Sequence, residues 1–371
     1  MDTRAPSRTP PAGSRGYLAA IIGACVVLGT LAVLGQLGPL FLAAFGGGQL
    51  PLLALAALGR LAPNSESARR GAVVVLYLIG GAFAAVVFAL AAVGLDAQGT
   101  VHARFSLLWL GATLFTLLAA PALLRAPSVR AALARWLPLD PDAFHHWIGL
   151  VAVLWFTAMP LVSLAVLGGR PPLEALLEQS GSESMGAPSW PELLYGLGWT
   201  VALCLVAAGF PLTRPLPAAL ARLGLGWPGW RGIALGIAIS ILMVPLFTVV
   251  DPLATAAVEA LGLATTSSAW IDRLFGRDFG LLGALAAALS AGLGEELVWR
   301  GVVQPRYGLG LAALGFASMH AFQYGPDGLI SVLLSGLLLG VLRQRTNTTV
   351  AAVAHGGYDL WLFLSMLYGW W

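Results

Sequence analysis

Long apolar runs separated by short polar stretches dominate this chain. A helix needs about 20 mostly apolar residues to cross a membrane, and we count eleven runs of roughly that length. Gly and Pro inside these runs do not argue against helices, because membrane helices tolerate both residues better than soluble helices do. The pattern therefore predicts an all-α, polytopic membrane bundle with about eleven transmembrane helices. The expected spans are approximately 17–36, 39–59, 71–94, 105–124, 146–168, 192–211, 232–250, 279–300, 308–324, 328–344 and 349–369.

The amino-acid composition supports the same class of protein. Of the 371 residues, 58% are hydrophobic and only 10% are charged, whereas a soluble domain has about 25% charged residues. We therefore expect a lipid bilayer around the protein and no nucleic-acid partner.

The basic residues are all Arg, and their distribution predicts the orientation in the membrane. With the N-terminus inside, sixteen of the 20 Arg residues fall in inner segments, as the positive-inside rule requires. The four in outer segments are Arg104, Arg170, Arg273 and Arg277. The sequence thus predicts a multi-pass protein of the cytoplasmic membrane, with its N-terminus inside and its C-terminus outside.

The chain divides into three parts. Residues 1–16 are rich in Arg and Pro and are expected to form a disordered cytoplasmic segment. Residues 17–278 contain about seven spans with almost no ionisable residue in their middles, which is typical of a scaffold. Residues 279–371 carry the ionisable residues that lie deep in apolar runs. A charge at bilayer depth costs roughly 3 kcal/mol or more, so we expect this last part to be a catalytic four-helix unit.

Two adjacent glutamates, Glu295 and Glu296, lie inside one of these apolar runs. Glu296 and Arg300 are four residues apart, so they share one face of a helix and can form an ion pair. Glu295 points about 100° away from that face. We therefore expect Glu296 and Arg300 to be structural, and Glu295 to be the freer carboxylate, suited to act as a general base.

Two later apolar runs contribute histidines. Phe316 and His320 share a helix face, as do His355 and Asp359. A buried imidazole needs a polar partner, and Asp359 can orient the ring of His355 and favour its charged form. Together with Glu295, these groups suffice to activate a water molecule against a peptide carbonyl and to stabilise the resulting oxyanion.

Three motifs follow one another in this part of the chain: Glu295-Glu296-x-x-x-Arg300, Phe316-x-x-x-His320 and His355-x-x-x-Asp359. Their order and spacing resemble the three motifs of the CAAX-protease and bacteriocin-processing intramembrane proteases, a family that includes the type II CAAX prenyl endopeptidases. The resemblance covers roughly residues 279–371. It implies a glutamate-dependent peptidase that acts within the membrane.

The resemblance also implies roles for single residues. Glu295 and His320 would activate the attacking water, and His355 and the residue at position 359 would form the oxyanion site. Glu296 and Arg300, which form the ion pair next to Glu295, would support the site structurally. The aromatic ring of Phe316 would do the same. The family's third motif often ends in Asn, whose amide can donate to an oxyanion, whereas an ionised Asp359 would repel it. Either Asp359 is protonated, or it acts indirectly, by keeping His355 charged so that His355 donates. We favour the second alternative.

A metal is the open point of the expected chemistry. Glu295, His320 and His355 are residue types that bind zinc, and they form the candidate set if a metal binds. The two histidines do not share a helix turn, however, and the chain has no HExxH motif. We favour water activation without a cofactor, with zinc as the alternative.

Three other functions fit parts of the pattern. The glutamates can form a purely structural ion network. The scaffold can belong to a non-catalytic immunity factor or chaperone-like protein, although such a protein does not need both His320 and His355. A proton-coupled transporter can use buried carboxylates as a relay, but we see no symmetry-related pair of broken helices. A membrane-embedded or lipid-anchored polypeptide is the expected substrate.

The expected span boundaries leave the candidate residues at unequal depths. If a span begins near Gly308, His320 lies about 18 Å deep, whereas Glu295, five residues before Arg300, lies about 8 Å deep. The groups can meet if the helix that carries His320 begins later, is tilted, or follows an interfacial stretch over residues 301–310. The alternative is that the expected span boundary is wrong.

Overall fold

The computed structural model describes residues 28–35, 37–180, 189–275 and 280–370. Every regular element in these ranges is helical, which confirms the predicted all-α class. The α-helices are α2 (Pro39–Leu61), α3 (Glu66–Arg125), α4 (Pro127–Leu133), α5 (Phe144–Val166), α6 (Pro172–Ser180), α7 (Trp190–Ala208), α8 (Leu216–Arg222), α9 (Gly229–Ala260), α10 (Ser268–Phe275), α11 (Gly280–Leu289), α12 (Gln304–Met319), α13 (Pro326–Arg345) and α14 (Thr348–Tyr368). Shorter or wider helical turns are η1 (Ala62–Asn64), η3 (Ser290–Glu295), η4 (Leu297–Val303) and η5 (His320–Phe322).

Within the described ranges, seven helical segments are long and apolar enough to cross a membrane. Five of them, α5, α7, α9, α13 and α14, coincide with expected spans, although α9 continues past the expected end at residue 250. The other two are Glu66–Leu90 and Gly280–Phe322. The expected span 39–59 coincides with α2, and most of the span 17–36 lies outside the described residues. The membrane class is confirmed, while the count of eleven and the orientation stay predictions.

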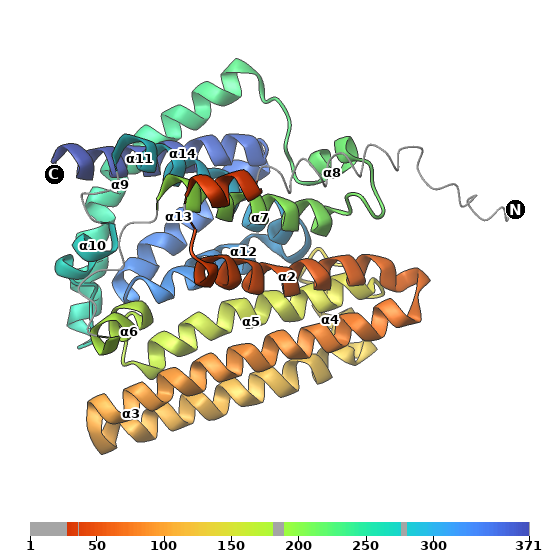
Figure 1. Ribbon diagram of the computed structural model, residues 1–371, viewed down its shortest axis with the longest axis horizontal. Coiled ribbons are helices and arrows are strands. Elements are labelled where there is room, and N and C mark those ends of the chain that lie inside the picture. The colour runs from red at the N-terminus through yellow and green to blue at the C-terminus, as the bar shows by residue number, and fades with distance from the viewer. Residues whose placement is uncertain (1–27, 36, 181–188, 276–279, 371) are drawn as a thin grey trace, which may run out of the picture.

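The helix α3 forms a hairpin along one side of the bundle. Figure 1 shows α3 doubling back on itself at its label, so that two arms run side by side below α5. The sequence predicts two separate spans here, 71–94 and 105–124, which agree with the two arms. The hairpin packs against α5.

The segment Gly280–Phe322 bends sharply at Gly308. This residue has φ 82° and ψ 170°, a conformation that glycine adopts far more readily than other residues. Glu295 precedes the bend by thirteen residues and His320 follows it by twelve. At 1.5 Å per residue both therefore lie roughly 18 to 20 Å from the bend. The helix continues past the span end expected at residue 300 as far as this bend, so both residues lie at similar distances from the bend.

The two arms on either side of this bend pack directly against each other. A Cβ atom on Gly315 would lie only 2.4 Å from the ring of Trp299, so the indole occupies the space over this glycine. Tyr307 at the bend donates its hydroxyl to the carbonyl oxygen of His146, at 2.9 Å. That bond attaches the bend to the first turn of α5, and the arms thereby hold fixed positions in the bundle.

The largest apolar core surrounds α5. Its buried Trp155 packs against Gly80 of α3, where a Cβ atom would lie 2.8 Å from the indole. On another side of the bundle, α14 packs against α9, α11 and η3. This second set of contacts brings the residues around His355 next to the helix that carries the two glutamates.

Candidate active site

The two glutamates lie on a helix that is locally wider than an α-helix. η3 and η4, on either side of Glu296, have π-helical hydrogen bonding. π-Helical turns are rare and are frequent at functional sites. The two carboxylates lie in different surroundings. The side chain of Glu296 is fully buried, whereas that of Glu295 is 36% exposed.

Glu296 forms an ion pair with Arg300, as the helical spacing indicates. Its Oε1 lies 3.0 Å from Arg300 Nη1, and both side chains are buried. Arg300 Nη2 also donates to the carbonyl oxygen of Gly336 on α13, at 3.2 Å. The guanidinium lies over the ring of Phe316, 4.4 Å from its centroid. Arg300 thus connects η4 with both α12 and α13.

Glu296 has a second partner that the sequence analysis missed. His355 Nδ1 lies 2.9 Å from Glu296 Oε1, and His355 Nε2 lies 3.5 Å from Asp359 Oδ2. Both ring nitrogens therefore face carboxylates, and an imidazolium can satisfy both because it has two N–H donors. The sequence analysis assigned the orientation of this ring to Asp359, whereas the shorter contact is to Glu296. No local spacing could reveal a contact between residues 59 positions apart.

Glu295 faces the other histidine. Its Oε2 lies 3.8 Å from His320 Nε2, and this oxygen has no hydrogen-bond partner among the described residues. His320 Nδ1 lies 2.9 Å from the carbonyl oxygen of Phe316. A carbonyl oxygen only accepts, so Nδ1 carries the hydrogen, and Nε2 of the neutral ring is left as an acceptor toward Glu295. Each member of this pair can accept a proton.

Phe316 contacts both imidazoles. Its ring centroid lies 5.0 Å from that of His320 and 5.7 Å from that of His355, and both contacts are edge-on. Tyr324 stacks on His320. The two rings are nearly parallel, and their centroids lie 6.1 Å apart. The burial of Tyr324 raises the pKa of its phenol, so this ring stays neutral beside the histidine. The candidate residues therefore form two couples, Glu295 with His320 and Glu296 with His355, that share Phe316.

Two glycines bring the second couple together. A Cβ atom on Gly292 would lie 2.6 Å from the Cα and N atoms of Gly356, and one on Gly356 would lie 2.8 Å from the carbonyl oxygen of Ala288. The backbones of η3 and α14 thus approach as closely as only glycine allows. Small residues in two apolar runs are a recognisable signal of such packing, but the sequence analysis did not use it.

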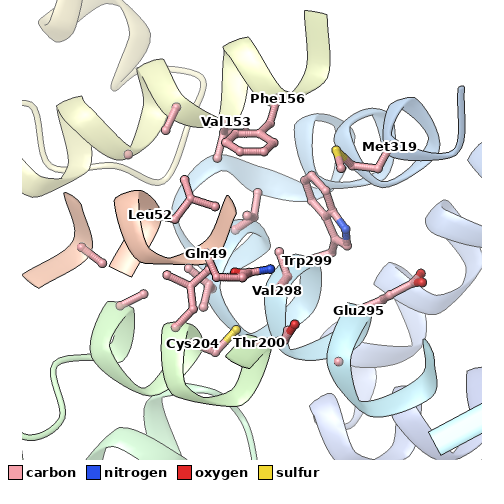
Figure 2. A pocket seen from close by; sticks show the side chains of 18 of the residues that line it. Gln49, Leu52, Val153, Phe156, Thr200, Cys204, Glu295, Val298, Trp299 and Met319 are labelled. Carbon is pink, nitrogen blue, oxygen red and sulfur yellow. The ribbon is translucent and has the colours of Figure 1, made fainter. Parts of the chain in front are cut away.

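One of the two couples lines a large cavity. The cavity has a volume of about 1020 Å³ and is bounded by α2, α5, α7, the π-helical turns and α12. Glu295 and His320 are part of its wall, whereas His355 and Asp359 are not. Figure 2 shows apolar side chains from several helices, among them Leu52 and Val298, gathered around this space. Glu295 therefore faces a space with a largely apolar wall, which suits an apolar peptide segment.

The side chains do not form a three-ligand metal site. Among the described residues, no three His, Cys, Asp or Glu side chains gather as a metal ion requires. The set that the sequence suggested for zinc, Glu295 with both histidines, is divided between the two couples. His355 faces a carboxylate with each of its ring nitrogens, at 2.9 Å from Glu296 and 3.5 Å from Asp359. We therefore derive no step through a metal.

Comparison with known proteins finds one family model that matches this part of the chain. Residues 277–361 match the family model described as type II CAAX prenyl endopeptidase Rce1-like. The match confirms the resemblance stated from the motifs, and it spans all the candidate residues. No curated protein and no solved structure matches the chain. At the level of the family, this segment is similar to membrane proteases.

Proposed function

On the basis of the family match over residues 277–361, we propose that this protein is an intramembrane endopeptidase that hydrolyses a peptide bond of a membrane-associated polypeptide. The substrate is membrane-embedded or lipid-anchored, and the enzyme is a multi-pass protein of the cell membrane. The observation that carries the proposal is the contact between Glu295 and His320 on the wall of the cavity.

Glu295 and His320 activate the attacking water. Their facing atoms, Oε2 and Nε2, are 3.8 Å apart, so a single water oxygen can lie about 2.8 Å from both. The water attacks the scissile carbonyl carbon and gives one proton to Glu295, while the C=O electron pair moves onto the carbonyl oxygen. When the tetrahedral intermediate collapses, the C–N bond breaks and that proton passes to the leaving amine.

His355 stabilises the oxyanion of the intermediate. As an imidazolium it directs Nδ1–H to Glu296 at 2.9 Å and Nε2–H toward Asp359 at 3.5 Å. The contact with Asp359 is longer than a normal hydrogen bond, so this N–H is available to donate a hydrogen bond to an oxyanion. Asp359 maintains the charge of the ring and does not itself contact the oxyanion. The buried ion pair of Glu296 and Arg300 supports this arrangement.

The experiment that tests the proposal compares membrane proteomes of cells that express the wild type or the Glu295→Ala variant. We expect at least one membrane polypeptide to accumulate as a longer precursor in the variant. Equal proteomes, together with a cellular phenotype that both forms rescue equally, would contradict the peptidase function and favour a non-catalytic role.

A further inference from the structure

The loop between α9 and α10 is hydrogen-bonded to the residues that follow His320. Most side chains of this loop are exposed, but Thr266 is half-buried, and Trp270, in the first turn of α10, is 2% exposed. Both side chains bond to residues 323–325, which connect η5 with α13. We call residues 264–270 the strap and residues 323–325 the connection. The proposed hydrolysis does not use the strap.

Trp270 bonds to the first residue of the connection. Its indole Nε1 donates to the carbonyl oxygen of Gln323, at 2.6 Å. A buried indole N–H usually has a partner, and here the partner is a backbone group three residues after His320. The backbone N–H of Gln323 in turn donates to the carbonyl oxygen of His320, at 2.9 Å. Two hydrogen bonds of a single residue therefore join Trp270 to the backbone of the histidine.

Thr266 bonds to the last residue of the connection. Its Oγ1 accepts from the backbone N–H of Gly325, at 2.9 Å, and donates to Asp327 Oδ1, at 2.8 Å. The backbone N–H of Thr266 donates to the same carboxylate oxygen, at 3.0 Å. Thr255 on α9 donates its hydroxyl to Asp327 Oδ2, at 3.3 Å. The carboxylate of Asp327 thus joins the strap to the first turn of α13.

Asp327 is a charged residue that the bundle buries. It is 6% exposed, and Asp is almost never so buried unless it is paired. Its hydrogen-bond partners are the hydroxyl and the N–H of Thr266 and the hydroxyl of Thr255, and the N-terminal end of α13 also favours a negative charge. Hydrogen bonds to a carboxylate are stronger than those between neutral groups. Because Thr266 supplies two of the three donors, this carboxylate chiefly fixes the position of the strap.

Tyr324 transmits the position of the connection to the histidine. It lies between the two residues that the strap binds, Gln323 and Gly325, and its ring stacks on that of His320 with the centroids 6.1 Å apart. A Cβ atom on Gly328 would lie 2.8 Å from Tyr324 Cβ, so α13 leaves the tyrosine little room to move. A displacement of the connection therefore displaces the ring that lies against the imidazole.

We propose that Thr266 and Trp270 are positioning residues for His320. The strap holds the connection in place, and Tyr324 then keeps the imidazole turned toward Glu295. The proposal rests on the proposed peptidase function and extends its machinery to a loop more than fifty positions away in the chain. Neither side chain of the strap is part of the cavity wall, so both act through the connection. Such support matters because a misplacement of about 1 Å can lower a catalytic rate on the order of 100-fold.

Two substitutions that remove single polar groups test this assignment. Trp270→Phe removes the N–H that bonds to Gln323, and Thr266→Val removes the hydroxyl but keeps the shape of the side chain. Cleavage of a quenched fluorescent peptide with an apolar segment is measured with the full chain in nanodiscs. We expect kcat per folded enzyme to fall about five- to tenfold in each variant, the effect of one lost hydrogen bond, with little change in KM. Thr266→Ser, which keeps the hydroxyl, should retain the wild-type kcat.

Two matched controls distinguish positioning from general destabilisation. Trp155→Phe makes the same change at a buried tryptophan whose Nε1 has no hydrogen-bond partner among the described residues. Thr248→Val removes a hydroxyl that bonds to Val244 of its own helix, at 2.9 Å. The unfolding temperature of every variant is recorded. We expect both controls to keep the wild-type kcat per folded enzyme, even where their unfolding temperature falls.

The chemical reactivity of His320 gives a second measurement that does not depend on turnover. Diethyl pyrocarbonate modifies neutral imidazoles, and mass spectrometry of the digested protein gives the rate at each histidine. The side chain of His320 is 20% exposed, and Tyr324 stacks on its ring. We expect its modification rate to rise about fivefold in Trp270→Phe and Thr266→Val, as loss of one hydrogen bond of the strap would give. His145, in the wall of the same cavity, is the internal reference and should react as in the wild type.

Several outcomes would overturn the proposal. An unchanged kcat in the folded strap variants does so, as does an unchanged modification rate at His320. An equal loss of kcat in Trp155→Phe and Trp270→Phe would show that the strap is only structural. If Thr266→Val does not fold, Trp270→Phe decides the outcome. If the wild type cleaves no peptide and no precursor accumulates in cells, while His320 still reacts faster in the strap variants, only the peptidase function is contradicted.

Discussion

Glu296 Oε1 lies 2.9 Å from His355 Nδ1. The same oxygen lies 3.0 Å from Arg300 Nη1, so one buried carboxylate pairs with a cation of its own helix and with the imidazole of α14. The pairing connects the first and third motifs of the candidate site. It also distinguishes the surroundings of the two adjacent glutamates, since Glu295 lines the cavity and Glu296 contacts a histidine.

The Glu296→Gln substitution should destabilise the protein. It leaves Arg300 buried without its negative partner and removes the nearer of the two carboxylates that face His355, and breaking a buried pair costs roughly 3 to 5 kcal/mol. We expect a lower unfolding temperature in detergent, measured by intrinsic fluorescence. Glu295→Gln, one position away on the same helix, is the control and should unfold like the wild type. An unchanged unfolding temperature in Glu296→Gln would contradict the structural role.

The Glu295→Gln substitution should abolish turnover and leave the fold intact. Glutamine keeps the shape of the side chain but cannot accept the proton of the water, and a general base contributes on the order of 10²- to 10⁴-fold in rate. Peptide cleavage by the purified protein measures the loss. We expect the His320→Gln substitution to lower the cleavage rate by a factor within the same range. A Glu295→Gln protein that retains most of its cleavage rate excludes Glu295 as the base.

The Asp359→Asn substitution should retain the structure and alter the pH profile of activity. The carboxylate 3.5 Å from His355 Nε2 favours the charged imidazole. Without it, the ring loses its proton at lower pH, so the alkaline limb of the profile should move to lower pH. The measurement is cleavage rate against pH for both proteins. A profile that coincides with that of the wild type would rule out this role of Asp359.

The Gly292→Ala substitution should reduce activity because it displaces one helix of the site. The added methyl group would lie 2.6 Å from the backbone of Gly356, which forces η3 away from α14 and costs about 1 to 3 kcal/mol. We expect lower cleavage and a lower unfolding temperature. Gly310→Ala is the control, because nothing lies within 4 Å of its Cβ position. Equal behaviour of the two variants would argue against a close helix contact.

Removal of metal ions should leave activity unchanged. Glu295 and His320 suffice to hold the attacking water in the proposed mechanism, and His355 is engaged by two carboxylates. Cleavage is measured after exhaustive dialysis against a chelator, with and without added zinc. Activity that disappears on dialysis and returns with zinc would show that the enzyme requires the metal.

The sequence alone determined the membrane class, the candidate motifs and the Glu296–Arg300 ion pair. These features depend on the length of apolar runs, on the high cost of charges in lipid and on the i, i+4 spacing of one helix. Each of them is local along the chain, so one sequence suffices to find it. The sequence did not reveal that the helix continues past residue 300 to a bend, because the bend depends on the backbone conformation of a single glycine, Gly308.

Only the tertiary structure decided which side chains meet. His355 reaches Glu296 because Gly292 and Gly356 let two backbones approach closely. Side chains as far apart in the chain as Arg60 and Arg306 line the same cavity. Such contacts depend on how helices far apart in the chain pack in three dimensions. Periodicity describes the faces of one helix and contains no information about which other helix covers them.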